Sequence, residues 1–236
     1  MFLSQAQACA ETGSPLTAGI LRLLADAMQP GTPVADKVLN WQGDLSRSGD
    51  ALALRLAAGL HALVLSGTDP ALTALYREPT AGDAEATALH LATLKTHEAH
   101  LLHWLQSPPQ TNEVRRSIPL IALAHWLTAG FNLPIHLSEL GASAGLNLMF
   151  DHYGLTLATR FGPTDVVLDL HTNWTGPLPP AASPVILDRA GVDLNPLDPV
   201  KDRLRLLSYI WPDQPDRLAR TATALDLAAQ MRPEIA

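Results

Sequence analysis

The sequence predicts a mixed α/β chain, with an all-α helical bundle over residues 1–130 followed by an α/β domain over residues 131–236. Leucines recur every three or four residues between Leu52 and Leu63, which is typical of a helix with one buried face. After Asn132 the pattern changes to short apolar runs that end at glycine or proline, which is typical of buried strands. These two patterns define the expected fold class.

The first half has a helical pattern almost throughout, interrupted by glycine and proline. Pro15 can open a helix, because proline fits the first turn, and Pro30-Gly31 would end it. The dipeptide Pro108-Pro109 would end a long helix, because proline cannot continue the backbone hydrogen bonds. We therefore expect helices over residues 15–29, 52–65, 83–105 and 112–128.

The second half alternates between strands and helices. Its first strand is the apolar run Pro134–Leu140, which meets glycines abruptly and is followed by a helix start at Leu146. Two strands around Gly162-Pro163 are expected to form a hairpin, and a later strand reaches Val192. The hairpin strands are expected over residues 155–160 and 166–171, and further helices over 198–209 and 214–231.

Composition excludes several classes of protein. The 236 residues carry a formal charge of −7, 47% are hydrophobic, and Cys9 is the single cysteine. This apolar content excludes a disordered chain, and one cysteine excludes a disulfide framework or a cysteine-rich metal site. The acidic balance and the lack of a long apolar run argue against nucleic-acid and membrane partners. With no secretory signal in the sequence, we expect a cytoplasmic protein that acts on a small-molecule or protein substrate.

A glycine-rich turn is the strongest chemical signal in the sequence. The segment Glu139–Gly145 (ELGASAG) follows a strand and precedes a helix, where glycines allow close approach of a ligand and the helix offers free N–H groups. The dinucleotide fingerprint would need glycine at positions 141, 143 and 146, and two of these are absent. The S-adenosylmethionine version fits better, because Glu139, Gly141 and Gly145 match and only Ser143 replaces a glycine.

An acidic residue at a second strand end supports this interpretation. In such folds the next parallel strand ends in an acid that accepts hydrogen bonds from ribose hydroxyls, and Asp193 occupies this kind of position. It follows Glu139 by 54 residues, where a simple crossover needs roughly 20, so the hairpin and the proline-rich loop would be an insertion. An ordinary strand–helix turn at Gly141 and an Asx turn at Asp193 are the alternatives.

Three segments carry a resemblance to a known family: residues 110–114 (QTNEV), 139–148 (ELGASAGLNL) and 211–214 (WPDQ). Over its whole length the chain resembles the uncharacterised bacterial family called domain of unknown function 2332. The glycine turn is similar to motif I of class I methyltransferases. The resemblance implies a Rossmann-like domain that binds S-adenosylmethionine, with a methyl acceptor that the sequence does not identify. The cofactor contacts would be Glu139, Gly141, Ala142, Ser143, Gly145, Asn147 and Asp193.

The C-terminal domain is expected to be partial. A complete class I methyltransferase sheet has seven strands, whereas two strands of its core can be placed in this sequence. We therefore expect either an apparently truncated Rossmann-like domain with an inserted β-hairpin, or a homodimer that covers the open sheet edges. A non-enzymatic assembly module with a degenerate nucleotide-binding fold is the corresponding alternative function.

A serine hydrolase is a second alternative. The segment Gly141–Gly145 also matches Gly-x-Ser-x-Gly, in which a strand–turn–helix exposes a nucleophilic serine, here Ser143. The required acid and base would be Asp165 or Asp169 followed by His171, both in the expected hairpin region.

Two polar clusters complete the candidates. Gln110, Asn112, Glu113 and Arg116 lie where the bundle meets the sheet, and they would form either a helix cap or a wall of the substrate site. His97, His100 and His103 share a helical spacing, but they drift around the helix by about 60° over two steps, and a metal site in a bundle would also need carboxylate partners from other helices. We expect these histidines to be structural, and no metal site.

Overall fold

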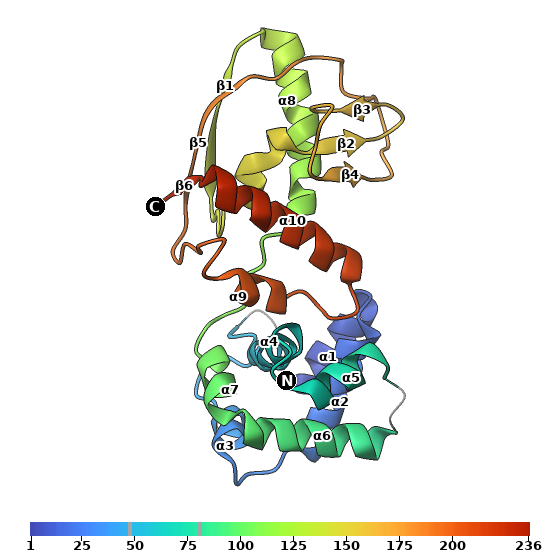
Figure 1. The fold of residues 1–236 in the computed structure, drawn as a ribbon, viewed down its shortest axis with the longest axis vertical. Helices are drawn as coiled ribbons and strands as arrows, with labels where there is room; N and C mark the ends of the chain where they lie inside the picture. Colours follow the sequence, from blue (N-terminus) through green and yellow to red (C-terminus); the bar gives the residue numbers. More distant parts are fainter. Residues whose placement is uncertain (47–48, 80–81) are drawn as a thin grey trace. The chain divides into compact units, whose positions relative to one another are not determined.

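The computed structural model describes residues 1–46, 49–79 and 82–236, and within them the chain is mixed α/β (Figure 1). It divides into two compact units, each made of two separate stretches of chain. Unit 1 comprises Met1–Gln110 and Leu204–Leu218, and unit 2 comprises Thr111–Arg203 and Ala219–Ala236. The segment 117–130, which the sequence pattern groups with the helical half, is therefore counted with the sheets in unit 2.

Unit 1 is helical and its core is built from leucine and alanine. Its helices are α1 (Phe2–Glu11), α2 (Pro15–Ala27), α3 (Pro33–Leu39), α4 (Leu52–Leu65), α5 (Pro70–Arg77), α6 (Asp83–Thr96) and α7 (Glu98–Leu105). Helices α2, α3 and α5 each begin with proline, whose fixed φ suits the first turn. The side chains of Thr32 and Asp69 cap α3 and α5 by accepting backbone N–H bonds.

The single helix expected over residues 83–105 is wrong, because the chain breaks at His97 into α6 and α7. His97 leaves the helical region with φ −110° and ψ 34°, and its imidazole lies 3.3 Å from the carboxylate of Asp69. The break allows α7 to approach α4 at Gly59, where a Cβ atom would lie 2.9 Å from Leu101 Cδ2. Close helix packing therefore overrides the continuous helical pattern.

Unit 2 contains two small sheets and the helices around them. Its elements are η1 (Val114–Arg116), α8 (Ser117–Phe131), β1 (Ile135–Leu140), η2 (Leu146–His152), β2 (Gly154–Thr156), β3 (Arg160–Phe161), β4 (Asp169–His171), β5 (Ile186–Val192) and β6 (Glu234–Ile235). Helices α9 (Arg203–Ser208) and α10 (Pro215–Met231) cross the boundaries between the units. The helix expected over residues 198–209 is shorter in the structure, where α9 begins at Arg203. The helix expected to start at Leu146 is the 3-10 helix η2.

Helix α8 carries the most apolar stretch of the sequence and starts later than expected. The segment from Asn112 to Glu113 is not helical, and the backbone passes through η1 before α8 begins at Ser117. The side chain of Glu113 caps η1 by accepting the N–H of Arg115, so among the residues expected to form a cap or a wall the cap is Glu113 and not Asn112. In the described part of the chain, no helix has both the length and the apolar character needed to cross a membrane.

The larger sheet is parallel throughout, with strand order β1-β5-β6. Glu139 on β1 is in register with Gly191 on β5, so the carboxyl ends of these strands meet at one edge. Strand β6 was not expected from the sequence. The segment between η2 and β5 contains the second sheet, in which β2 pairs antiparallel with β3 and parallel with β4. The expected two-stranded hairpin is therefore a three-stranded sheet.

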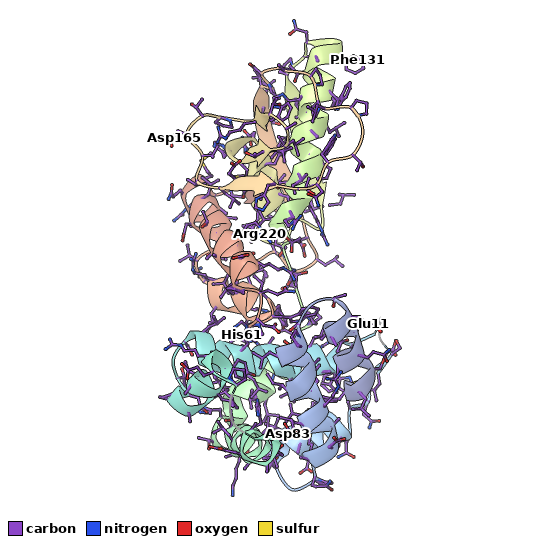
Figure 2. The ribbon with its side chains drawn as sticks, turned by 90° about the vertical axis from the view of Figure 1, so that its right-hand side faces the viewer. Glu11, His61, Asp83, Phe131, Asp165 and Arg220 are labelled. Carbon is purple, nitrogen blue, oxygen red and sulfur yellow. The ribbon has the colours of Figure 1, made fainter. Side chains whose placement is uncertain are left out.

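The two faces of the β1–β5 pair differ in their surroundings. On one face Leu137 and Glu139 are half-buried, and η2 packs against both strands (Figure 1). On the other face Leu140 is 86% exposed, and the other side chains of that face, His136, Ser138, Asp188, Ala190 and Val192, are also exposed. Phe131, at the end of α8, is 69% exposed (Figure 2). Within the described residues, this face of the sheet is open.

Candidate functional site

The glycine turn connects β1 to η2 through three residues in the left-handed region. Gly141, Ser143 and Gly145 have φ angles of +72°, +54° and +71°. Glycine adopts such angles without a steric penalty, whereas a residue with a Cβ atom pays about 1–2 kcal/mol. Ser143 therefore adopts a backbone conformation that favours glycine.

The turn packs against β5 and β6 at close range. The N–H groups of Gly141 and Ala142 both donate to the carbonyl of Val192, at 2.8 and 3.1 Å. A Cβ atom on Gly145 would lie 2.7 Å from Pro233 Cγ, and a Cβ atom on Gly191 would clash with Ala142. Glycine is thus required at 145 by both its φ angle and the close approach of its neighbours.

Asp193 lies beside the turn, as the sequence predicts. Its Oδ2 accepts a 2.8 Å hydrogen bond from the backbone N–H of Ser143, and its Oδ1 accepts one from the N–H of Asn195. The long separation from Glu139 is explained by the second sheet and its loops, which are inserted between η2 and β5. The structure therefore brings Glu139, the turn and Asp193 to one edge of a parallel sheet.

Three buried polar side chains, two amides and one hydroxyl, hold the turn in place through consecutive hydrogen bonds. Asn112 Nδ2 donates to the carbonyl of Ala142 at 3.0 Å, and its Oδ1 accepts from Asn147 Nδ2 at 3.0 Å. Asn147 Oδ1 in turn accepts from the hydroxyl of Ser117 at 2.9 Å. Asn112 was expected in a substrate wall and Asn147 in a cofactor contact, whereas no role was expected for Ser117. The three side chains connect the start of α8 with the turn.

Glu139 is a half-buried carboxyl group with one oxygen unused. Its Oε2 is buried and has no hydrogen-bond partner among the described residues. Burial raises the pKa of Glu139, while a hydrogen bond to Asn147 and the charge of Arg116 act in the opposite direction. The charge of Asp193 adds to the upward shift. Glu139 Oε2 is therefore a buried acceptor at the sheet edge that has no hydrogen-bond partner among the described residues.

The comparison with known sequences gives one result. A family described as an uncharacterized protein conserved in bacteria, DUF2332, matches residues 1–236. The chain belongs to this family. No curated protein and no solved structure matches it.

The remaining predicted wall residues of this DUF2332 chain lie in different places. Gln110 ends the first stretch of unit 1, whereas Asn112, Glu113 and Arg116 belong to unit 2. Glu113 Oε1 lies 3.7 Å from Arg220 Nη2 of α10, and this contact could not be predicted because Arg220 lies far along the chain. Arg116 is exposed at the start of α8, and its charge acts on Glu139. Arg116 is thus the cation associated with the turn.

The Ser143 hydroxyl does not form the contacts of a hydrolase nucleophile. It is buried and has no hydrogen-bond partner among the described residues, whereas an activated serine is held by a basic side chain. Asp169 instead accepts from Thr156 and lies 3.8 Å from Arg160, and His171 is exposed on β4. The expected acid and base are therefore not assembled at Ser143.

The three helix-spaced histidines also have separate surroundings. His100 Nε2 bonds to the carbonyl of Gly59 at 2.9 Å and its ring stacks on Trp104 at 4.3 Å, while His103 meets the edge of Trp104. Together with the contact between His97 and the carboxylate of Asp69, these interactions engage each imidazole separately. Among the described residues, no cluster of three metal-ligating side chains is present.

A hollow of about 540 Å³ adjoins the turn at Ala144. Its walls come from the loop after β5, the end of α10 and β6, and they include Leu197, Lys201, Arg232 and Ile235. The volume falls within the range of about 300–1,000 Å³ that small-molecule sites occupy. Of the turn residues only Ala144 lines it, so Glu139 and Asp193 lie at the sheet edge outside the hollow.

Proposed function

We propose that the chain binds S-adenosylmethionine at the carboxyl edge of β1 and β5 and acts as a methyltransferase. The observation that carries the proposal is the contact between Ser143 N and Asp193 Oδ2, because it unites the turn with a strand-end acid. A parallel pair of strands with a left-handed turn after the first and an acid after the second is the arrangement that nucleoside ligands occupy.

The unpartnered polar groups support a ligand at this edge. Glu139 Oε2 is a suitable acceptor for the ammonium group of the methionine part, since a buried carboxyl oxygen without a partner is costly. An ammonium ion at this position would favour the ionised carboxylate and so lower the raised pKa of Glu139. The carboxylate of Asp193 is held beside the turn by two backbone N–H groups, and in this position it would accept a ribose hydroxyl.

Methyl transfer makes modest demands on the protein's own chemistry. The sulfonium supplies the methyl group, and the chain must hold it in line with a nucleophile, so orientation accounts for most of the rate. The fixed turn provides this rigidity, because Asn112 and Val192 hold it through hydrogen bonds from opposite sides. The methyl acceptor would be a small molecule or a protein.

Isothermal titration with S-adenosylmethionine and S-adenosylhomocysteine tests the proposal. We expect Asp193→Asn to weaken binding by tenfold or more, because the amide keeps one acceptor for the turn but loses the charge and the second acceptor. Asp188→Asn is the matched control, since this acid lies on the same strand, is exposed, and contacts His136. Absence of binding to the wild-type chain at millimolar ligand would refute the proposal.

The open face of the sheet favours assembly as a second candidate function. Leu140 and Val192 are 86% and 47% exposed, and exposed apolar side chains gathered on one face mark contact surfaces for other chains. We expect light scattering to show a homodimer that Leu140→Glu dissociates and Leu178→Glu leaves intact. A monomer at every concentration would exclude this candidate.

A further inference from the structure

Unit 2 contains a second cavity, of about 270 Å³, away from the glycine turn. It is bounded by α8, by the end of η2 and by two loops, residues 162–163 and 182–184. Its apolar walls include Ile121, Phe150, Tyr153 and Pro184. A dry apolar cavity of about 150 Å³ holds a benzene molecule, so this one has room for a substituted or fused ring.

His125 of α8 lines this cavity and has an unused nitrogen. The side chain is only 5% exposed, and its ring meets the edge of Phe161 with centroids 5.1 Å apart. Its backbone partner is Pro180, which offers a carbonyl and no N–H. Nδ1 is buried and has no partner among the described residues, so the bond to Pro180 belongs to Nε2–H. Nδ1 therefore carries the free lone pair of a neutral imidazole.

Two of the polar side chains that line the cavity are already engaged, and a third, Ser183, is exposed. The carboxylate of Asp151 pairs with Arg189 through two bonds of 2.7 and 2.9 Å, and the hydroxyl of Tyr153 donates to the carbonyl of Leu146. Burial also lowers the pKa of His125, which keeps the ring uncharged. The cavity thus presents an apolar and aromatic wall, a paired carboxylate and one acceptor nitrogen.

We propose that this cavity binds a neutral aromatic molecule with a single O–H or N–H donor, of the phenol or indole class, whose donor bonds to His125 Nδ1. The aromatic walls match a flat ring, and the donor satisfies His125 Nδ1, a buried acceptor without a partner among the described residues. Because Nδ1 is closed to water in the empty cavity, binding includes a small shift of the imidazole or of the 182–184 loop. This site is independent of S-adenosylmethionine binding.

Titration of the full chain with matched pairs of probes tests the site. We expect phenol to bind about tenfold more tightly than benzene, and indole about tenfold more tightly than indene, which is the gain of one net hydrogen bond. In ¹⁵N spectra of the imidazole, the Nδ1 signal of His125 should shift with phenol and indole and stay in place with the hydrocarbons. Equal affinity within each pair, or no binding of any probe, would overturn the proposal.

Two variants separate the hydrogen bond from the cavity itself. His125→Leu should bring the phenol-to-benzene ratio close to one, while His171→Leu, at an exposed histidine of the same unit, should leave the ratio unchanged. Ala182→Leu at the rim should block all four probes without disturbing the helix, which keeps the test decisive if His125→Leu does not fold. Unchanged binding by Ala182→Leu would place the probes elsewhere and contradict the proposal.

Discussion

The backbone N–H of Ser143 donates a 2.8 Å hydrogen bond to Asp193 Oδ2 across fifty positions of sequence. The bond closes the glycine turn against the loop that follows β5. Because Ser143 has a φ of +54°, its N–H direction depends on a backbone conformation that serine rarely adopts. The turn therefore combines a conformational cost with a specific tertiary contact.

Ser143→Gly should stabilise the chain by roughly 1 kcal/mol. Glycine relieves the left-handed strain and removes a buried hydroxyl without a partner, and these gains exceed its greater entropy in the unfolded chain. Urea denaturation measures the change. Asn132→Gly is the control, because asparagine tolerates the left-handed region and its φ of +51° should give a smaller gain. Equal or lower stability of Ser143→Gly would show that the hydroxyl has a partner in solution.

Gly145→Ala should destabilise the chain far more than Gly176→Ala. Both glycines have positive φ angles, +71° and +97°, so both alanines are strained by about 1–2 kcal/mol. The new methyl group at 145 meets Pro233 and Ile235, whereas the one at 176 has nothing within 4 Å. Overpacking of this kind adds about 1–3 kcal/mol, so chemical denaturation should separate the two variants by that amount. An equal loss of stability in the two variants would indicate that β6 shifts without cost to make room for the methyl group at position 145.

Unit 1 should lose stability as the pH falls below the ordinary histidine value of 6.5. His61 and His90 are 3% and 1% exposed, and burial lowers the pKa of both, although the charge of Asp69 acts in the opposite direction on His90. Below pH 6.5 these histidines are protonated in the unfolded chain and stay neutral in the folded chain, so a fall in pH favours unfolding. The free energy of unfolding decreases by up to about 1.4 kcal/mol for each pH unit by which burial lowers a histidine pKa. Thermal melts between pH 8 and pH 5 report the effect.

His90→Gln should flatten this pH dependence, and His103→Gln should not, because His103 is exposed. An identical slope for wild type and His90→Gln would show that His90 is not protonated on unfolding in this range.

The pair of Arg189 and Asp151 should contribute more to stability than a surface pair of the same length. Arg189 binds both carboxylate oxygens and also the carbonyl of Leu148, and both side chains are about one-fifth exposed. A double-mutant cycle with Arg189→Met and Asp151→Asn should give a coupling of about 2 kcal/mol. The same cycle for Arg203 and Asp226, 2.8 Å apart but more exposed, should give less than about 1 kcal/mol. Similar couplings would indicate that solvent screens both pairs.

Local patterns were sufficient to predict the parts of the site that lie near each other in sequence. The strand and the glycine turn follow from residue types at fixed offsets, whereas Asp193 was matched as a strand-end acid 54 residues after Glu139. The structure places all three together. The contacts made by Ser117 with Asn147 and by Arg220 with Glu113 were not predicted, because Ser117 and Arg220 have no distinguishing neighbours in the sequence. Their roles arise from the packing of α8 and α10, which only the tertiary structure defines.

Errors in the predicted elements arose where long-range packing competes with local preference. Nothing in the pattern around His97 ends a helix, yet the contact with Asp69 and the approach of α7 to Gly59 break it there. Strand β6 has only two residues, too few for any alternation to be visible, and it forms because β5 offers an unpaired edge. Pairing of β2 with β4 likewise depends on a neighbour beyond the expected hairpin.

The division of unit 1 into two stretches affects how it can form on the ribosome. Asp213 accepts the backbone N–H of Leu16 at 2.9 Å, and the carbonyl of Ser208 contacts His61, so residues 204–218 complete the first helices. At synthesis rates of about 5–20 residues per second, the segment from 110 to 204 delays that completion by roughly 5–20 s. The packing of the amino-terminal helices must therefore stay incomplete, and their apolar faces accessible to chaperones, while most of unit 2 is being synthesised.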